Sequence, residues 1–242
     1  HVVVESGRLR IAPGRNISAG DNIVPQGAQA CKEDELLSVG TVMSFAQIAL
    51  AAACGCETLE VFVRPRVAIL STGDEVVPVS ATPGPAQIRN SNGPMLAALV
   101  SAAGGEPLVL PITPDDADAL DAAMIQARHA DMLLVTGGVS AGKFDLVEPA
   151  LARAGASFHF TGVRIQPGKP LVFGELPKKD GLRMIPYFGL PGNPVSSAAT
   201  FLLFAAPVLA ALAGRSERGP RFVLAKLGQA PGKQGRAKLT RF

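Results

Sequence analysis

Residues 67–75 read Val-Ala-Ile-Leu-Ser-Thr-Gly-Asp-Glu, an apolar run that leads directly into a polar, glycine-containing loop. The arrangement returns twice, in apolar runs at residues 108–112 and 132–135 that are each followed by polar or glycine-bearing residues. Short continuous apolar runs are typical of strands covered on both faces. The three segments therefore predict strands of one parallel sheet.

The segments between these strands carry the start and stop residues of helices. Pro94 to Ala103 begins with proline and ends at two glycines, while Thr113 to Asp116 opens a second helix with a cap, a proline and acids in the first turn. We expect further helices from Leu146 to Ala154 and from Val195 to Ala213. Strands that alternate with helices predict an α/β fold, with a mostly parallel sheet and helices on both faces.

The two ends of the chain differ in composition from this α/β region. Residues 1–64 hold short apolar pieces between turn residues and then an Ala-rich helical pattern, and residues 215–242 are basic, Gly-rich and alternating. We therefore expect a partial β-rich N-terminal region (1–64), an α/β domain (65–214) and the start of a C-terminal β domain (215–242). Three more strands are expected inside the α/β domain, at residues 158–165, 171–173 and 184–188.

Composition excludes several classes of protein. Hydrophobic residues make up 48% and charged residues 18% of the chain, which argues against disorder, and a net charge of +3 without a basic run argues against nucleic acid as a partner. The most apolar stretch, residues 201–214, contains Pro207 and is shorter than the roughly 20 residues of a membrane span, so no membrane is expected. Three cysteines without a disulfide-rich pattern predict a reducing, cytoplasmic location.

Polar loops follow the predicted strands at the point where each strand ends. In an open α/β sheet, the carboxyl ends of the strands form the ligand crevice. We expect five loops to meet there: residues 72–75, 115–116, 136–145, 166–170 and 189–194. Several carboxylates in one crevice would repel each other unless a hard cation were bound, and oxygen ligands of this kind suit Mg²⁺. The carboxylates concerned are Asp74, Glu75, Asp115 and Asp145.

The loop after the third strand nearly matches two catalytic motifs. Residues 137–143 have the spacing of a P-loop, but Phe144 stands where Ser or Thr would bind Mg²⁺. Residues 138–142 match the nucleophile elbow of hydrolases, but the downstream histidine His159 follows too soon for a triad. We expect instead that backbone N–H groups of this loop hold an anion, with Ser140 as an additional donor.

Each candidate also has a purely structural interpretation. Asp115 and Asp116 could simply stabilise the first turn of a helix, and Lys169 could be a surface lysine rather than a point charge for an oxyanion. Asn193 could cap the last helix rather than contact a ligand.

Four motifs, taken in chain order, carry a family resemblance. They are Leu70-Ser-Thr-Gly-Asp-Glu75, Thr136-Gly-Gly-Val-Ser140 with Gly142 and Asp145, Pro167-Gly-Lys-Pro170, and Gly189-Leu-Pro-Gly-Asn-Pro-Val-Ser196. Together they resemble the molybdopterin molybdenumtransferase family, which includes the E domain of gephyrin. The resemblance implies a Mg²⁺-dependent, cytoplasmic and dimeric enzyme that takes adenylylated molybdopterin and molybdate and releases AMP with molybdenum cofactor.

The resemblance also implies roles for particular residues. The expected catalytic acids are Glu75, Asp115 and Asp145, and Asp74 joins these three as a metal ligand. The expected substrate-binding residues are Thr72, Gly73, Gly137, Gly138, Ser140, Lys169, Pro191, Asn193 and Pro194.

Two departures and two alternatives accompany this assignment. Gln166 stands where many relatives have Lys, which would weaken attraction for molybdate, and residues 1–64 and 215–242 are expected to be only parts of the family's outer domains. One alternative is the related molybdopterin adenylyltransferase family. Its third loop is similar to Thr-Gly-Gly-Thr-Gly, whereas this chain has Thr136-Gly-Gly-Val-Ser140. A binding or scaffold module, as in gephyrin, is the other alternative.

Overall fold

The computed structural model of the chain describes residues 2–12, 14, 16, 18–137, 146–220 and 222–226, which fall into two units, 1–38 and 39–242. In the first unit, β1 (Val2–Glu5) pairs antiparallel with β2 (Arg8–Ile11) around a turn at Ser6 and Gly7, both with positive φ. Every residue of these two strands is exposed to solvent.

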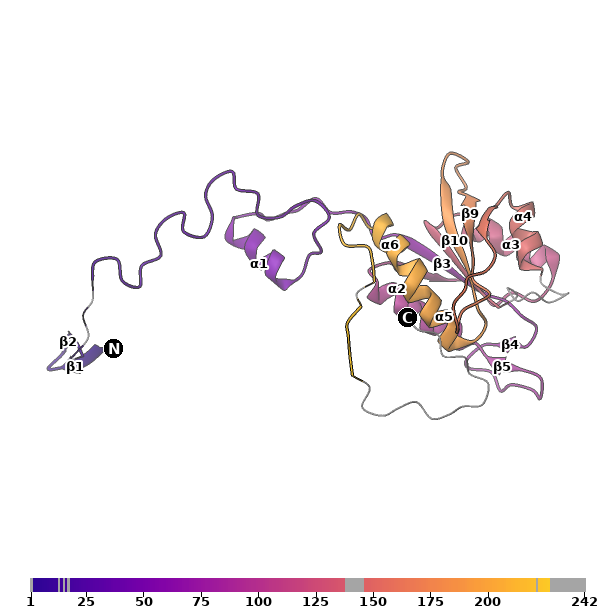
Figure 1. Cartoon of the computed structure of the whole chain (residues 1–242), viewed down its shortest axis with the longest axis horizontal. Coiled ribbons are helices and arrows are strands. Elements are labelled where there is room, and N and C mark those ends of the chain that lie inside the picture. Colours follow the sequence, from indigo (N-terminus) through magenta and orange to yellow (C-terminus); the bar gives the residue numbers. More distant parts are fainter. Residues whose placement is uncertain are drawn as a thin grey trace. The chain divides into compact units, whose positions relative to one another are not determined.

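A six-stranded sheet forms the centre of the second unit (Figure 1). Its strand order is β6-β3-β7-β10-β9-β8. The strands are β3 (Arg66–Ser71), β6 (Glu106–Val109), β7 (Met132–Thr136), β8 (Ser157–Phe160), β9 (Val172–Pro177) and β10 (Met184–Leu190). The first four in spatial order are parallel, β9 runs antiparallel to β10, and β8 runs antiparallel to β9. The expected mostly parallel sheet is confirmed, and the loop after β8 leaves the same edge as the loops after β3, β7 and β10.

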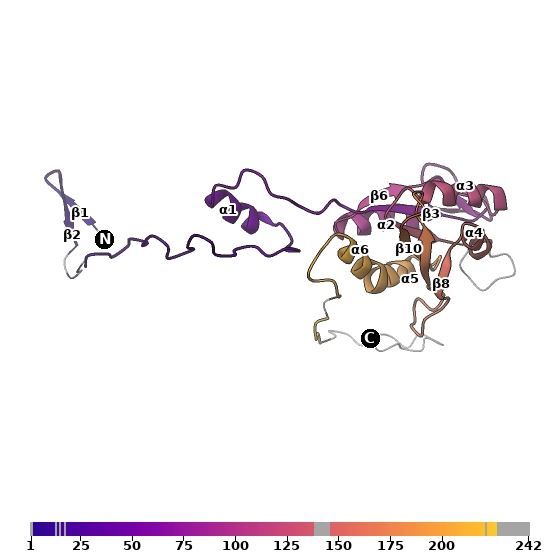
Figure 2. The ribbon, with the colours of Figure 1, turned by 90° about the horizontal axis from the view of Figure 1, so that it is seen from above.

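Helices cover both faces of this sheet, as expected (Figure 2). One face packs against α3 (Ala117–Ala127) and α4 (Val147–Arg153), and the other against α2 (Asn92–Ala102), α5 (Pro194–Thr200), the π-helical turn η1 (Phe201–Ala205) and α6 (Ala206–Leu212). Alternate residues of a strand point to opposite faces, so Ala68 belongs to the first core and Ile69 to the second. Both faces of the central strands are therefore buried, which explains their uninterrupted apolar sequence.

The start of α3 differs from the expectation. The helix begins at Ala117, and its N-cap is Asp116, whose side chain accepts a hydrogen bond from the Ala119 N–H at 2.9 Å. Thr113 is not the cap, because it forms a bridge with Thr72 that extends the sheet. Asp115 consequently lies before the helix, and the interpretation of this acid as a first-turn residue is wrong.

The last helical stretch is longer than the apolar segment considered above. Helical turns run without a break from Pro194 to Leu212, long and apolar enough by length and composition to cross a membrane, although core helices pass the same test. Phe201, Ala205 and Leu209 of this stretch lie in the core. The π-helical turn directly precedes the turn that contains Pro207, which has no N–H to donate to an earlier carbonyl.

Smaller elements complete the second unit. They are α1 (Phe45–Ala53) and the short parallel pair β4 (Val76–Val77) and β5 (Ile88–Arg89). The C-terminal β strands expected within residues 215–242 are not present at 222–226, and residues 227–242 lie outside the described part of the chain.

Candidate functional site

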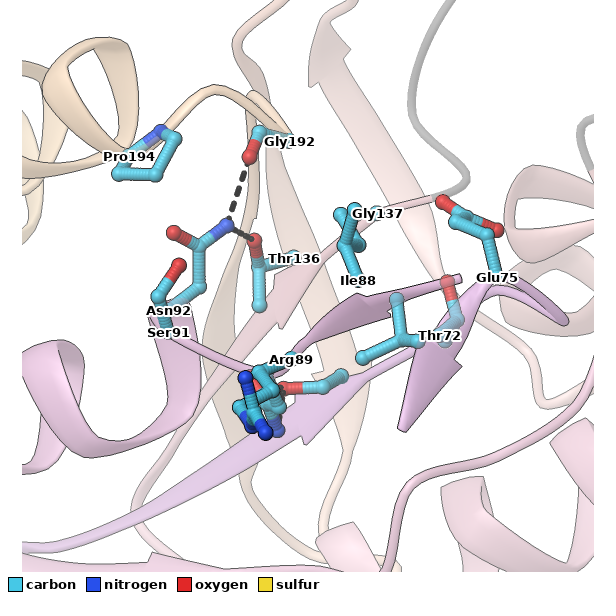
Figure 3. Close-up of a pocket in the computed structure, with 13 residues that line it drawn as sticks. Thr72, Glu75, Ile88, Arg89, Ser91, Asn92, Thr136, Gly137, Gly192 and Pro194 are labelled. Carbon is cyan, nitrogen blue, oxygen red and sulfur yellow. Dashed lines mark hydrogen bonds between the residues drawn. The ribbon is translucent and has the colours of Figure 1, made fainter. Parts of the chain in front are cut away.

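A pocket opens where β3, β7 and β10 end side by side (Figure 3). Ser71 of β3 and Leu190 of β10 are both in register with Thr136 of β7, so the three strands end at one level. The pocket has an empty volume of about 420 Å³ that is open to solvent. It is lined by Ser71, Thr72, Glu75, Val76, Ile88, Arg89, Asn90, Ser91, Asn92, Thr136, Gly137, Gly192 and Pro194.

The loop after β3 is fixed by backbone hydrogen bonds to its neighbours. The Thr72 N–H donates to the Thr136 carbonyl at 3.0 Å, and the Gly73 N–H donates to the Thr113 carbonyl at 3.3 Å. Gly137 has a φ of +91°, and a Cβ there would overlap the Thr72 carbonyl oxygen, so only glycine fits this approach of two backbones. The Thr72 side chain is fully buried, and its hydroxyl has no hydrogen-bond partner in the described part of the chain.

Asn92, at the start of α2, joins three elements around the pocket. Its Nδ2 donates to Thr136 Oγ1 at 2.7 Å and to the Gly192 carbonyl at 2.8 Å, as the dashed lines in Figure 3 show. A carbonyl can only accept, so this contact fixes which end of the amide faces Gly192. The Oδ1 atom of Asn92 is then buried with no partner among the described residues. An unpaired buried acceptor costs about 1–3 kcal/mol, so a ligand donor here would be favoured.

Asn90 ties the same helix start to the end of β3. Its Nδ2 donates to Ser71 Oγ at 3.0 Å, and its Oδ1 accepts from the Gly93 N–H at 2.8 Å. Residues 88–92 therefore form a wall of the pocket that was not expected from the sequence. The available signal was the polar run Asn90-Ser-Asn-Gly93 in front of Pro94, where only Pro94 was interpreted, as a helix start.

Three of the four expected metal ligands lie close together. The Asp115 N–H donates to Asp74 Oδ1 at 3.1 Å, and burial, followed by the charges of Asp74 and Glu75, raises the pKa of Asp115 above its ordinary value. Glu75 lines the pocket, whereas Asp74 and Asp115 stand beside it. Within the described residues, no three Asp, Glu, His or Cys side chains are arranged to hold a metal ion.

The other expected site residues have mixed outcomes. Thr72, Gly137 and Pro194 line the pocket, and Gly73 and the buried Pro191 lie next to lining residues in the chain. Asn193 caps α5 by accepting from the N–H groups of Val195 and Ser196 at 3.1 and 3.2 Å, which confirms its structural interpretation. Lys169 is exposed and does not line the pocket. Gly138, Ser140 and Asp145 lie outside the described residues.

Comparison with known proteins gives a consistent result. A family model described as "probable molybdopterin binding domain" matches residues 68–211, more than half of the chain. The chain is 41% identical over 181 residues to a molybdopterin molybdenumtransferase of Nostoc sp., covering 74% of this chain and 41% of that protein. It is 35% identical over 206 residues to a protein of the same name from Bacillus subtilis, covering 85% of this chain and 46% of that protein. The chain thus spans about half the length of these relatives.

Solved structures agree with the sequence comparison. A crystal structure of the molybdopterin biosynthesis MoeA protein from Pyrococcus horikoshii superposes with a TM-score of 0.69 at 33% identity, covering 79% of this chain and 46% of that chain. Another crystal structure with the name molybdopterin biosynthesis MoeA protein, from Pyrococcus horikoshii OT3, superposes with a TM-score of 0.64 at 28% identity, covering 90% of this chain and 51% of that chain.

Proposed function

The chain belongs to the family of the probable molybdopterin binding domain, and from this premise we propose that it transfers molybdenum to molybdopterin. In the proposed reaction, adenylylated molybdopterin and molybdate react in the pocket, AMP is released, and molybdenum cofactor is formed. Relatives named molybdopterin molybdenumtransferase favour this reaction over adenylylation of the pterin.

One observation carries the proposal: the pocket at the ends of β3, β7 and β10 combines one acid, Glu75, with buried polar atoms that have no partner among the described residues. A small-molecule site is concave and has a few convergent polar groups, and here these are Glu75, Thr72 and Asn92. The crevice at the carboxyl ends of the strands is where open α/β sheets bind their ligands.

The donor set beside the pocket suits a hard cation. Asp74, Glu75 and Asp115 supply carboxylate oxygens. Burial, and after it the charges of Asp74 and Glu75, raises the pKa of Asp115, and a nearby cation would offset the repulsion between these charges. Mg²⁺ usually takes only one or two carboxylates together with substrate phosphates, so a full protein cage is not required. One or two of these carboxylates would hold Mg²⁺ together with substrate phosphate, and the bound ion would neutralise phosphate charge. Asp145 as a fourth ligand, Ser140 and Lys169 as oxyanion contacts, the cytoplasmic location and the dimer remain predictions.

The proposal is tested by supplying the purified chain with adenylylated molybdopterin, molybdate and Mg²⁺ and measuring AMP release. Asp115→Asn keeps the side-chain size but removes one charge, so the rate at limiting Mg²⁺ should fall about tenfold or more. Glu57→Gln, an exposed acid outside the pocket, is the matched control and should leave the rate unchanged.

Two results would contradict the proposal. The first is a chain that neither binds molybdopterin nor releases AMP. The second is an Asp115→Asn variant whose dependence on Mg²⁺ equals that of the wild type.

A further inference from the structure

Arg89 contributes a positive charge to the described lining of the pocket. Among the described residues that line the pocket, Glu75 and Arg89 are the charged ones. Figure 3 shows the two side chains apart, with Glu75 close to Thr72 and Arg89 on another side. Arg89 forms no ion pair with any described residue, so its charge is not neutralised by the part of the protein that the structure describes.

The guanidinium of Arg89 is held in place by the backbone. Its Nε donates to the carbonyls of Val79 and Ala81, each at 3.1 Å. The residue itself is on β5, where the Ile88 N–H donates to the Glu75 carbonyl at 2.7 Å and the Asn90 N–H donates to the Val77 carbonyl at 2.8 Å. An arginine has five N–H donors. The Nε donor is used here, and no residue in the described part of the chain accepts from either Nη atom, so the Nη donors face a ligand without a described competitor.

We propose that Arg89 binds the phosphate group of the ligand that occupies this pocket. The proposal rests on the proposed function, in which both the pterin and the AMP part carry phosphate. A planar guanidinium matches the oxygens of a phosphate with two parallel hydrogen bonds, and a guanidinium already anchored through Nε loses little conformational freedom on binding. Glu75 repels an anion, so the phosphate lies at the Arg89 side and the uncharged ring lies toward Thr72 and Asn92.

The position of Lys169 makes this assignment specific. Both side chains are exposed, but Lys169 is absent from the pocket lining, whereas Arg89 lines the pocket and its Nε is hydrogen-bonded to backbone carbonyls. The phosphate contact is therefore assigned to a residue on β5 rather than to the lysine of the Pro167-Gly-Lys-Pro170 motif.

The test measures affinities by calorimetry at low salt, for the wild-type chain and for Arg89→Gln, Arg89→Lys and Arg183→Gln. Two ligand pairs are compared: AMP with adenosine, and molybdopterin with its dephosphorylated form. The wild type should prefer the phosphorylated member of at least one pair. Arg89→Gln should weaken that ligand about ten- to hundredfold and remove the preference, and added salt should reduce the effect. The pair that loses its preference identifies which phosphate Arg89 binds.

Two variants serve as controls. Arg89→Lys keeps a charge without the planar fork and should show intermediate affinity, which also covers the case in which Arg89→Gln fails to fold. Arg183 is an exposed arginine in the β9–β10 hairpin, at the opposite edge of the sheet, and Arg183→Gln should bind like the wild type.

The outcomes separate this inference from the proposed function. If the wild type binds no member of either pair, both fail. If the wild type binds a phosphorylated ligand and the folded Arg89 variants bind it equally well, only the assignment of Arg89 is overturned. The assignment of Arg89 is also overturned if the wild type binds the phosphorylated and the dephosphorylated member of each pair with equal affinity.

Discussion

At the scale of single residues, Gly137 gives the clearest prediction, because a side chain there meets backbone rather than a movable side chain. Gly137→Ala would place Cβ against the Thr72 carbonyl and impose a φ of +91° on alanine. The Thr72 backbone cannot withdraw without losing its hydrogen bond to Thr136. We expect the free energy of unfolding to fall by about 2–4 kcal/mol, as measured by urea denaturation.

Gly192 provides the matched comparison in the same pocket. A Cβ at Gly192 meets nothing within 4 Å, and its φ is outside the left-handed region. Gly192→Ala should therefore change stability by less than about 1 kcal/mol. Equal losses in the two variants would show that the close approach at Gly137 is not what requires glycine.

At the scale of elements, hydrogen bonds to Asp131 connect three strands at the edge of the sheet opposite the pocket. Asp131, just before β7, accepts from Lys178 Nζ at 2.6 Å and from the Arg66 N–H at 2.9 Å, and so joins β7 to the end of β9 and the start of β3. Burial alone would raise the pKa of Asp131, but the hydrogen bonds from Lys178 and Arg66 outweigh it and lower the pKa below 3.8. Asp131→Asn should lower the free energy of unfolding at pH 7 by about 1–2 kcal/mol.

The sign of the pH dependence follows from the lowered pKa. A carboxylate whose pKa is lower in the folded than in the unfolded protein stabilises the fold fully when the pH is above its pKa in the unfolded state. This stabilisation is lost as the pH falls through its pKa in the folded state. The difference between wild type and Asp131→Asn, measured by denaturation at several pH values, should therefore shrink below about pH 4. Asp121→Asn breaks a more exposed pair with Arg153 and should cost about 0–1 kcal/mol. A difference that grows on acidification would contradict the assigned role.

The elements themselves were largely predictable from the sequence, and the site only in part. Buried central strands have no polar face, so the apolar run at Val67 identifies β3 without tertiary information. Asn92 is hydrogen-bonded to Thr136 and Gly192, which lie 44 and 100 positions away in the sequence, and no local pattern predicts such contacts. The start of α3 was misplaced because Thr113 and Asp116 are both good caps, and the bridge from Thr113 to Thr72 decided between them.

At the scale of the whole molecule, the family match coincides with the part of the chain that has a core. Both clusters of buried apolar residues lie within residues 67–210, and the match covers 68–211. The first unit contributes no residue to either cluster, and its two strands are exposed throughout. Burial of apolar area is the main favourable term in folding, so stability should be concentrated in the α/β part of the chain.

Hydrogen exchange of the full chain measures this distribution directly. An isolated two-stranded hairpin is marginally stable in water, so the amides of β1 and β2 should exchange within the shortest labelling times. The amides of β3, β7 and β10 lie between other strands and beneath helices on both faces, so they should exchange only by near-global unfolding and be protected by several orders of magnitude more. Mass spectrometry of peptides from residues 2–11 and 66–71 would report both rates in one sample. Comparable protection of the two peptides would mean that the N-terminal hairpin has its own stabilising partner, and stability would then not be confined to the α/β part.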